Sequence, residues 1–124
     1  MIKGIGTDLI EIDRIARVCG EYGQRFLGRL FTEAERAYFA RWTDAAPGIA
    51  GRFAAKEAVM KALGTGWGRG VRFCDIEIER RPSGRPNVVL HGRCRDIFRE
   101  LGGSQIHCTI THSRTHAMAV VIFE

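Results

Sequence analysis

The amino-acid sequence predicts an α+β fold. The strongest helical pattern, residues 49–63, lies near the middle of the chain, and strand-like patterns occupy both ends. Because helices and strands follow one another in a mixed order, α+β is the natural class. The chain has 124 residues and no internal repeat or linker-like segment, so we expect one domain spanning residues 1–124.

The chain is predicted to begin with a strand. Residues 2–12 (IKGIGTDLIEI) mix β-branched residues with two glycines and a carboxylate, a pattern that suits a strand better than a helix and places Asp8 near its middle. Asp13 can then cap a helix over residues 14–19. A short arginine-rich stretch is expected after this helix.

Two further helices carry recognisable start and stop signals. Thr32 followed by Glu35 forms a capping-box signal for a helix over residues 33–39. The segment 49–63 is rich in alanine, begins at a Pro-Gly pair and ends at Gly64, where a C-terminal cap is favoured. The rest predicts strands around one more helix: strands over 71–80, 88–91, 105–111 and 117–123, a turn at RPSGRPN, and a helix near 93–101.

Charge and cysteine content narrow the functional classes. The 19 Lys and Arg exceed the 14 Asp and Glu, and the net charge of +5 favours acidic partners: nucleic acid, phosphorylated cofactors or acidic proteins. No helix-turn-helix, zinc-finger or RNP-like signature supports nucleic acid. A module that assembles without catalysis is the other non-enzyme alternative.

The cysteines and the apolar segments predict where the protein is found. The four cysteines lack metal-binding spacing, and no leader-like segment precedes the first strand. No apolar run reaches the roughly 18–20 residues that span a bilayer. We therefore expect a reduced, cytoplasmic protein that is not in a membrane.

The helix over 49–63 presents an acid and a base on one face. At about 100° per residue, Phe53, Glu57, Lys61 and Gly64 fall on one stripe. This pair could belong to a site. The alternative is an ordinary i,i+4 ion pair on the surface, which stabilises a helix by only a few tenths of a kcal/mol.

The segment after this helix is dense in glycine. GTG at Gly64, Thr65 and Gly66 is followed by glycines at 68 and 70. Glycine lets backbone amides approach a ligand closely, and phosphate is a plausible one. The alternative is an ordinary helix stop, because the spacing matches neither the Walker pattern nor the dinucleotide fingerprint.

Asp8 is the second informative acid. An ionised carboxylate on a strand flanked by Ile5 and Leu9 is costly to bury unless a positive charge faces it. With Glu57, Asp8 would form an all-oxygen pair of the kind that holds Mg²⁺. The alternative is that Asp8 pairs with a basic side chain of the same helix, Arg52 or Lys56.

Two groups of polar residues are further candidates. His112 and Ser113 lie where the last two strands are expected to turn, so they could contact a ligand or simply form a hairpin. His107 and His112 differ by five residues and would face opposite sides of a strand, which argues against a joint metal site. Six arginines against three glutamates between residues 14 and 41 form either a docking surface for an acidic partner or a solvated basic face.

Two segments resemble the signature of the 4′-phosphopantetheinyl transferases: GIGTDLIEIDRI at the N-terminus and GRFAAKEAVMKALGTG in the long helix. The resemblance extends to FCDIEIERRPSGRPNV and THSRTHAMAVV, and it points to the short, single-domain acyl-carrier-protein synthase type. It implies an antiparallel sheet packed against a long helix, and trimers with active sites at subunit boundaries. It also implies an activity: transfer of 4′-phosphopantetheine from coenzyme A to a serine of apo-acyl carrier protein, releasing adenosine 3′,5′-bisphosphate, in fatty acid biosynthesis.

The resemblance also implies roles for individual residues. Asp8 and Glu57 would hold Mg²⁺ on the pyrophosphate of coenzyme A, and Lys61 would lie beside the phosphates. Softer assignments make coenzyme A contacts of Arg52, Gly64, Thr65, Gly66, the turn ending at Gly84–Pro86, His112 and Ser113. A helix bearing arginines would dock the acidic carrier through Arg14, and through Arg17, Arg25 or Arg29.

Overall fold

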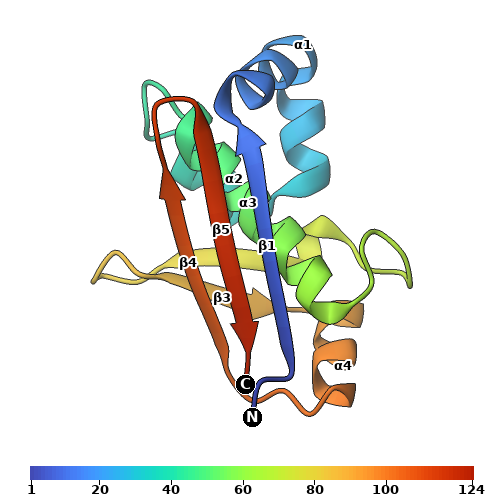
Figure 1. Cartoon of the computed structure of the whole chain (residues 1–124). Coiled ribbons are helices and arrows are strands. Elements are labelled where there is room, and N and C mark those ends of the chain that lie inside the picture. Colours follow the sequence, from blue (N-terminus) through green and yellow to red (C-terminus); the bar gives the residue numbers. More distant parts are fainter.

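The computed structural model describes the whole chain, residues 1–124 (Figure 1). Its elements are β1 (Gly4–Glu11), α1 (Ile12–Leu30), α2 (Glu33–Phe39), α3 (Ala46–Leu63), the 3-10 turn η1 (Phe73–Asp75), β2 (Ile76–Arg80), β3 (Pro86–Leu90), α4 (Gly92–Glu100), β4 (Ile106–His112) and β5 (His116–Phe123). An antiparallel sheet has the order β1-β5-β4, and β2 and β3 form a separate antiparallel hairpin. The sheet packs against α3 (Figure 1), which confirms the predicted α+β class.

The helix predicted over 14–19 is confirmed, but its predicted end was wrong, because the arginine-rich stretch expected to follow it is helical as well. α1 runs to Leu30 with a kink at Gly23, whose φ is 51°. The helix continues because apolar residues recur at helical spacing and pack on the core, including Ile15, Phe26 and Leu30. Asp13 is not the cap either. It lies in the first turn, and the N-cap residue makes no side-chain hydrogen bond.

The strand predicted from residue 71 begins only at Ile76, because residues 73–75 form η1. The side chain of Lys56 explains the difference: its ammonium donates hydrogen bonds to the carbonyl oxygens of Phe73 and Ile76. The other elements are confirmed to within a few residues. The capping box of Thr32 and Glu35 is formed, and Gly64 caps α3 in the left-handed conformation.

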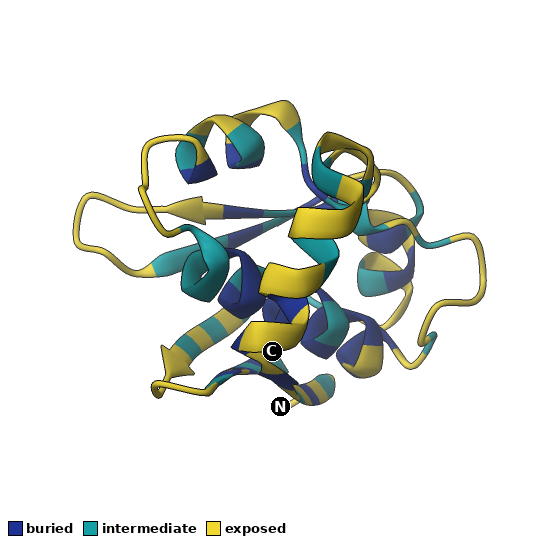
Figure 2. Ribbon diagram, turned by 90° about the horizontal axis from the view of Figure 1, so that it is seen from above, coloured by how far each residue is buried: buried dark blue, intermediate teal, exposed yellow.

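The backbones of β1 and α3 lie in direct contact. A Cβ atom at Gly6 would lie 1.8 Å from the carbonyl oxygen of Ala58, and one at Gly4 would lie 2.4 Å from that of Ala62. Small residues on both elements therefore permit the close approach. Figure 2 shows the resulting burial: buried residues gather on α3, and every second residue of β5 is buried.

The other face of the three-stranded sheet is uncovered. Alternation along the strands turns Ile5, Leu9 and Met118 away from α3, and their exposed fractions are 63%, 62% and 38%. No other element of the chain lies over this face (Figure 1). None of the helices combines the length and apolar character needed to cross a membrane.

Candidate active site

The contact between β1 and α3 brings Asp8 and Lys61 together. Asp8 follows Gly6 on the inner face of β1, where the two backbones touch. Lys61 Nζ lies 3.2 Å from Asp8 Oδ1 and donates a hydrogen bond of 2.9 Å to the carbonyl oxygen of Thr7. The ammonium of α3 thus neutralises part of the carboxylate charge on β1.

This arrangement contradicts both structural alternatives for the acids. Lys61 forms its ion pair with Asp8 and not with Glu57, so the surface i,i+4 pair is absent. Asp8 pairs with neither Arg52 nor Lys56. Lys56 instead pairs with Glu35 on the other side of α3.

Glu57 lies beside Asp8 in an unusual charge environment. Burial raises the pKa of its carboxyl group, and the charge of Asp8 raises it further, while Lys61 and Arg14 act in the opposite direction. No ion pair includes Glu57. Lys61 pairs with only one of the two neighbouring carboxylates, and the direct ion-pair partner that Glu57 lacks is what a bound cation would supply.

The donor set fits Mg²⁺. This ion prefers oxygen ligands and is commonly held by one or two carboxylates, with substrate phosphates and water completing its octahedron. Asp8 and Glu57 supply two carboxylates. No group of three or more His, Cys, Asp and Glu side chains forms a metal site made of protein alone. The chemistry of this pair therefore suits a cation shared with a phosphorylated ligand.

A cleft of about 410 Å³ opens beside the carboxylates. Its charged side chains include Asp8, Glu11, Arg14 and Glu57, and its apolar ones include Ile15, Val18, Phe26, Phe53 and Trp67. Phe73 supports the apolar part, because its ring stacks on Phe53 at 5.6 Å and meets Trp67 edge to face at 6.2 Å. The cleft suits a ligand with a charged head and an uncharged arm.

The GTG loop follows directly after Lys61. The N–H of Gly64 bonds to the carbonyls of Met60 and Lys61, so this glycine is a helix stop, as the simpler alternative predicted. Thr65 turns its hydroxyl to the carbonyl oxygen of Gly66 at 2.8 Å. The N–H groups of Gly66 and Trp67 make no backbone hydrogen bond and remain available to an anion.

A second cleft, of about 470 Å³, collects other predicted ligand contacts. Arg52, Gly84, Pro86 and His112 line it together with aromatic residues. Arg52 lies over the ring of Tyr38 at 4.2 Å, and its buried Nε has no hydrogen-bond partner. A half-buried guanidinium that makes no ion pair is suited to bind an anionic group such as phosphate.

The two clefts are separate within one chain. Arg52 and Glu57 are five residues apart on α3, which places them about 140° apart around the helix axis. The clefts share no lining residue. Ser113 lines neither: its hydroxyl accepts hydrogen bonds from the N–H groups of Thr115 and His116, so it stabilises the β4–β5 turn.

The profile of the 4′-phosphopantetheinyl transferase superfamily matches residues 4–121 of this sequence. The chain belongs to this superfamily. It is 45% identical over 124 residues to a holo-[acyl-carrier-protein] synthase of Koribacter versatilis, covering 100% of this chain and 99% of that protein. A relative of the same description in Alkalilimnicola ehrlichii is 46% identical over 125 residues, covering 100% of this chain and 98% of the relative.

Solved structures of transferases with this description share the fold. The crystal structure of the Neisseria meningitidis holo-[acyl-carrier-protein] synthase superposes with a TM-score of 0.91 at 35% identity, covering 100% of this chain and 99% of that chain. The Helicobacter pylori enzyme, crystallised in complex with coenzyme A, gives 0.85 at 31% identity, covering 97% and 99%. The fold and the family predicted from the sequence are therefore confirmed.

In this transferase the four arginines predicted to dock a carrier lie on α1 and are exposed: Arg14, Arg17, Arg25 and Arg29. None of them takes part in an ion pair. The kink at Gly23 separates the first two from the last two. Arg14 also lines the carboxylate cleft, so the basic surface reaches the predicted catalytic residues.

Sequence reasoning missed several residues of this transferase's clefts. Trp67 and Phe26 line the carboxylate cleft, and Tyr38, Trp42 and Arg80 line the second one. The clustering of Trp67 with the glycines was a usable signal, because an aromatic residue in a glycine-rich loop is free to face a ligand. The residues of the second cleft come from distant segments, and no local pattern relates them.

Proposed function

We propose that this chain transfers the 4′-phosphopantetheine group of coenzyme A to a serine of an apo-acyl carrier protein and releases adenosine 3′,5′-bisphosphate, in fatty acid biosynthesis in the cytoplasm. The whole chain would act as one domain. The observation that supports it best is the meeting of Asp8, Glu57 and Lys61 at the head of a cleft with an apolar wall, in a chain whose relatives are holo-[acyl-carrier-protein] synthases.

Asp8, Glu57 and Lys61 would each have a task in this reaction. Asp8 and Glu57 would hold Mg²⁺, which neutralises charge on the pyrophosphate of coenzyme A. The serine oxygen bonds to the β-phosphorus while the bond from that phosphorus to the departing nucleotide breaks. Glu57 or a water molecule in the cleft would accept the serine proton. Lys61 stabilises charge on the transferred phosphoryl group, because positioning and electrostatics supply most of the help in phosphoryl transfer.

The remaining residues would bind the two substrates. The free N–H groups beside Gly66 are suited to the pyrophosphate, and the second cleft, with Arg52, Pro86 and His112, is suited to the nucleotide end of coenzyme A. Arg14, Arg17, Arg25 and Arg29 present unpaired positive charge to the acidic carrier, which favours rapid association.

Intact-mass spectrometry tests the proposed function directly. The purified protein is incubated with coenzyme A, Mg²⁺ and apo-acyl carrier protein, with an EDTA control. A mass gain equal to one phosphopantetheine on the carrier, lost with EDTA, is expected. If a folded protein modifies none of several carriers, the proposed function is wrong.

Replacing Lys61 with alanine is expected to lower kcat by roughly 100- to 1000-fold, the usual cost of removing one transition-state donor. The KM for coenzyme A should change much less, because the ammonium acts mainly on developing charge. Steady-state kinetics with the carrier assay measures both constants. Lys3→Ala removes an exposed lysine away from the cleft and should leave both unchanged. A variant whose KM rises at constant kcat would make Lys61 a binding group only.

We also propose that the protein is a homotrimer whose active sites join the two clefts of neighbouring subunits. The uncovered sheet face supports this proposal, because Ile5 and Met118 lie exposed on it. So does the separation of the nucleotide-binding candidates from the carboxylates within one chain. In a closed ring of three subunits, the carboxylate cleft of each subunit would meet the second cleft of a neighbouring subunit.

Ile5→Glu is expected to give a folded monomer without transferase activity, because a charge on the sheet face prevents its burial between subunits. Light scattering after gel filtration measures the mass, and circular dichroism checks folding. Leu101→Glu changes an exposed leucine outside the sheet and should stay trimeric and active. Mixing the separately inactive Glu57→Gln and Arg52→Ala chains should restore about a quarter of the activity by random assembly. A fully active monomer would exclude shared sites.

A further inference from the structure

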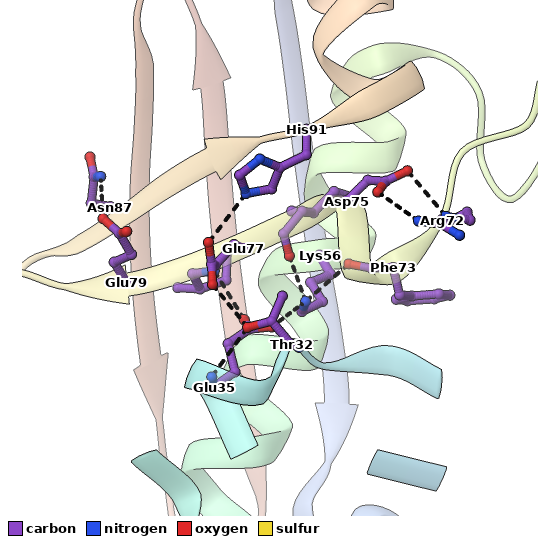
Figure 3. Close-up of polar contacts among 12 residues, drawn as sticks. Thr32, Glu35, Lys56, Arg72, Phe73, Asp75, Glu77, Glu79, Asn87 and His91 are labelled. Carbon is purple, nitrogen blue, oxygen red and sulfur yellow. Dashed lines mark hydrogen bonds and ion pairs between the residues drawn. The ribbon is translucent and has the colours of Figure 1, made fainter. Parts of the chain in front are cut away.

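Lys56 is the one basic side chain buried in the core. It lies on α3 immediately before Glu57, and its exposed fraction is 0%. Its ammonium donates a hydrogen bond of 2.8 Å to Glu35 Oε1, one of 3.0 Å to the carbonyl oxygen of Phe73, and a third to the carbonyl oxygen of Ile76 (Figure 3). All three donors of the ammonium are therefore used, each by a partner outside α3.

Glu35 completes this network from α2. Its Oε1 also accepts from the N–H of Thr32 at 2.9 Å, and its Oε2 accepts from the N–H of Ile78 at 3.0 Å. Figure 3 shows Glu35 and Lys56 between α2, α3 and the strand that begins at Ile76. The ion pair thus ties three segments of the chain to each other at one point.

Stability does not account for this arrangement. Removing two charges from water is expensive, and apolar residues of similar volume usually stabilise a core at least as well. The neighbouring core positions of α3 are filled by Ala54, Ala55, Ala58 and Val59, so the fold buries apolar residues there without difficulty. An ion pair, unlike a contact between apolar residues, fixes the direction of each of its hydrogen bonds.

The position of the Glu57 carboxylate depends on how α3 is oriented. This carboxylate makes no ion pair of its own, so its position follows from the rotation and height of α3. Lys56 fixes both the rotation and the height of α3, because its hydrogen-bond partners Glu35, Phe73 and Ile76 belong to other segments of the chain. The bond to Phe73 also holds the ring that supports Phe53 and Trp67, the apolar wall of the same cleft.

We propose that the buried Lys56–Glu35 ion pair is a positioning device for the carboxylate site, holding Glu57 at the distance from Asp8 that a shared divalent cation requires. This inference rests on the proposed function. A displacement of about 1 Å in a catalytic group can cost roughly 100-fold in rate, so a small rotation of α3 would matter. Lys56 and Glu35 touch no substrate and act through Glu57.

The test compares variants of equal stability. Lys56→Met removes the cation, and the double variant E35Q/K56M also removes the charge it leaves behind, which restores much of the lost stability. Ile97→Ala, on the buried face of α4, is expected to lower the melting temperature without changing the pair. For each protein we would measure the melting temperature, the Kd for Mn²⁺ by electron paramagnetic resonance without coenzyme A, and the Mg²⁺ concentration that half-activates transfer.

Both variants of the pair are expected to weaken Mn²⁺ binding by roughly 10- to 100-fold, as loss of a supporting contact around a metal site typically does. The Mg²⁺ requirement should rise in parallel, while Ile97→Ala at the same melting temperature keeps wild-type values. Wild-type metal affinity and turnover in E35Q/K56M would reduce the pair to a structural role and overturn the proposal. If the wild-type protein transfers nothing to any carrier, the proposed function fails, and the Mn²⁺ affinities alone decide the role of the pair.

Discussion

Replacing Glu57 with glutamine is expected to abolish transfer and, in the absence of metal, to raise the thermal stability of the protein at neutral pH. The amide keeps the size of the carboxylate but removes the charge that would hold Mg²⁺. We expect turnover to fall by at least roughly 100- to 1000-fold, the range for loss of one electrostatic catalytic group. Unchanged turnover with Mg²⁺ present would make the assignment of Glu57 wrong.

The gain in stability follows from the raised pKa of Glu57, which is caused first by burial and then by the charge of Asp8. A carboxyl group whose pKa is higher in the folded protein favours folding only when protonated. That contribution is complete below the unfolded pKa and disappears as the pH rises through the folded pKa. The wild-type protein therefore carries a penalty at neutral pH that the variant lacks.

Calorimetry in EDTA between about pH 3 and pH 8 measures the difference, because this range begins below the unfolded pKa of a glutamate and ends well above it. The melting temperature of Glu57→Gln should exceed that of the wild type near neutrality, and the two should converge towards acid pH. Glu77→Gln is a matched control for which we expect the opposite change in stability at neutral pH. Burial alone would raise the pKa of Glu77, but hydrogen bonds from Thr32 and His91 outweigh it and lower the pKa. This variant should be less stable than the wild type at neutral pH.

Gly6→Ala is expected to destabilise the protein severely and to abolish activity. The added Cβ would lie 1.8 Å from the carbonyl oxygen of Ala58, and neither backbone can yield without separating β1 from α3. Overpacking of a core typically costs about 1–3 kcal/mol and more where backbone must move. The same separation would draw Asp8 away from Glu57 and Lys61. Urea denaturation and the carrier assay measure the two effects.

Gly20→Ala provides the control for Gly6→Ala. Gly20 lies in α1 with nothing within 4 Å of an added Cβ, so alanine should stabilise the helix by up to about 1 kcal/mol and leave turnover unchanged. If Gly6→Ala unfolds at the same urea concentration as the wild type, the close contact between β1 and α3 does not position the site.

Local chemistry in the sequence was enough to place most elements and the two acids. The capping box of Thr32 and Glu35 and the cap at Gly64 depend on hydrogen bonds between residues within a few positions, so a short window contains the whole signal. The motifs around Asp8 and Glu57 were specific enough to indicate the superfamily, which residues 4–121 then matched. Glycines at 4 and 6 were visible as exceptions in a strand, but their reason, the carbonyl groups of α3, was not.

Tertiary structure decided which charges meet. Glu35 was predicted as part of a cap, yet its carboxylate also binds Lys56, a residue 21 positions away. Asp8 faces Lys61 across 53 positions. The strand expected from residue 71 gives way to η1, where the ammonium of Lys56 binds the carbonyl groups of Phe73, the first residue of η1, and Ile76, the residue that follows it. Arg52 and Glu57, neighbours on one helix, line different clefts. Backbone conformation responds to residues within about one helical turn, whereas ion pairs and clefts depend on how separate segments pack, which a local pattern does not encode.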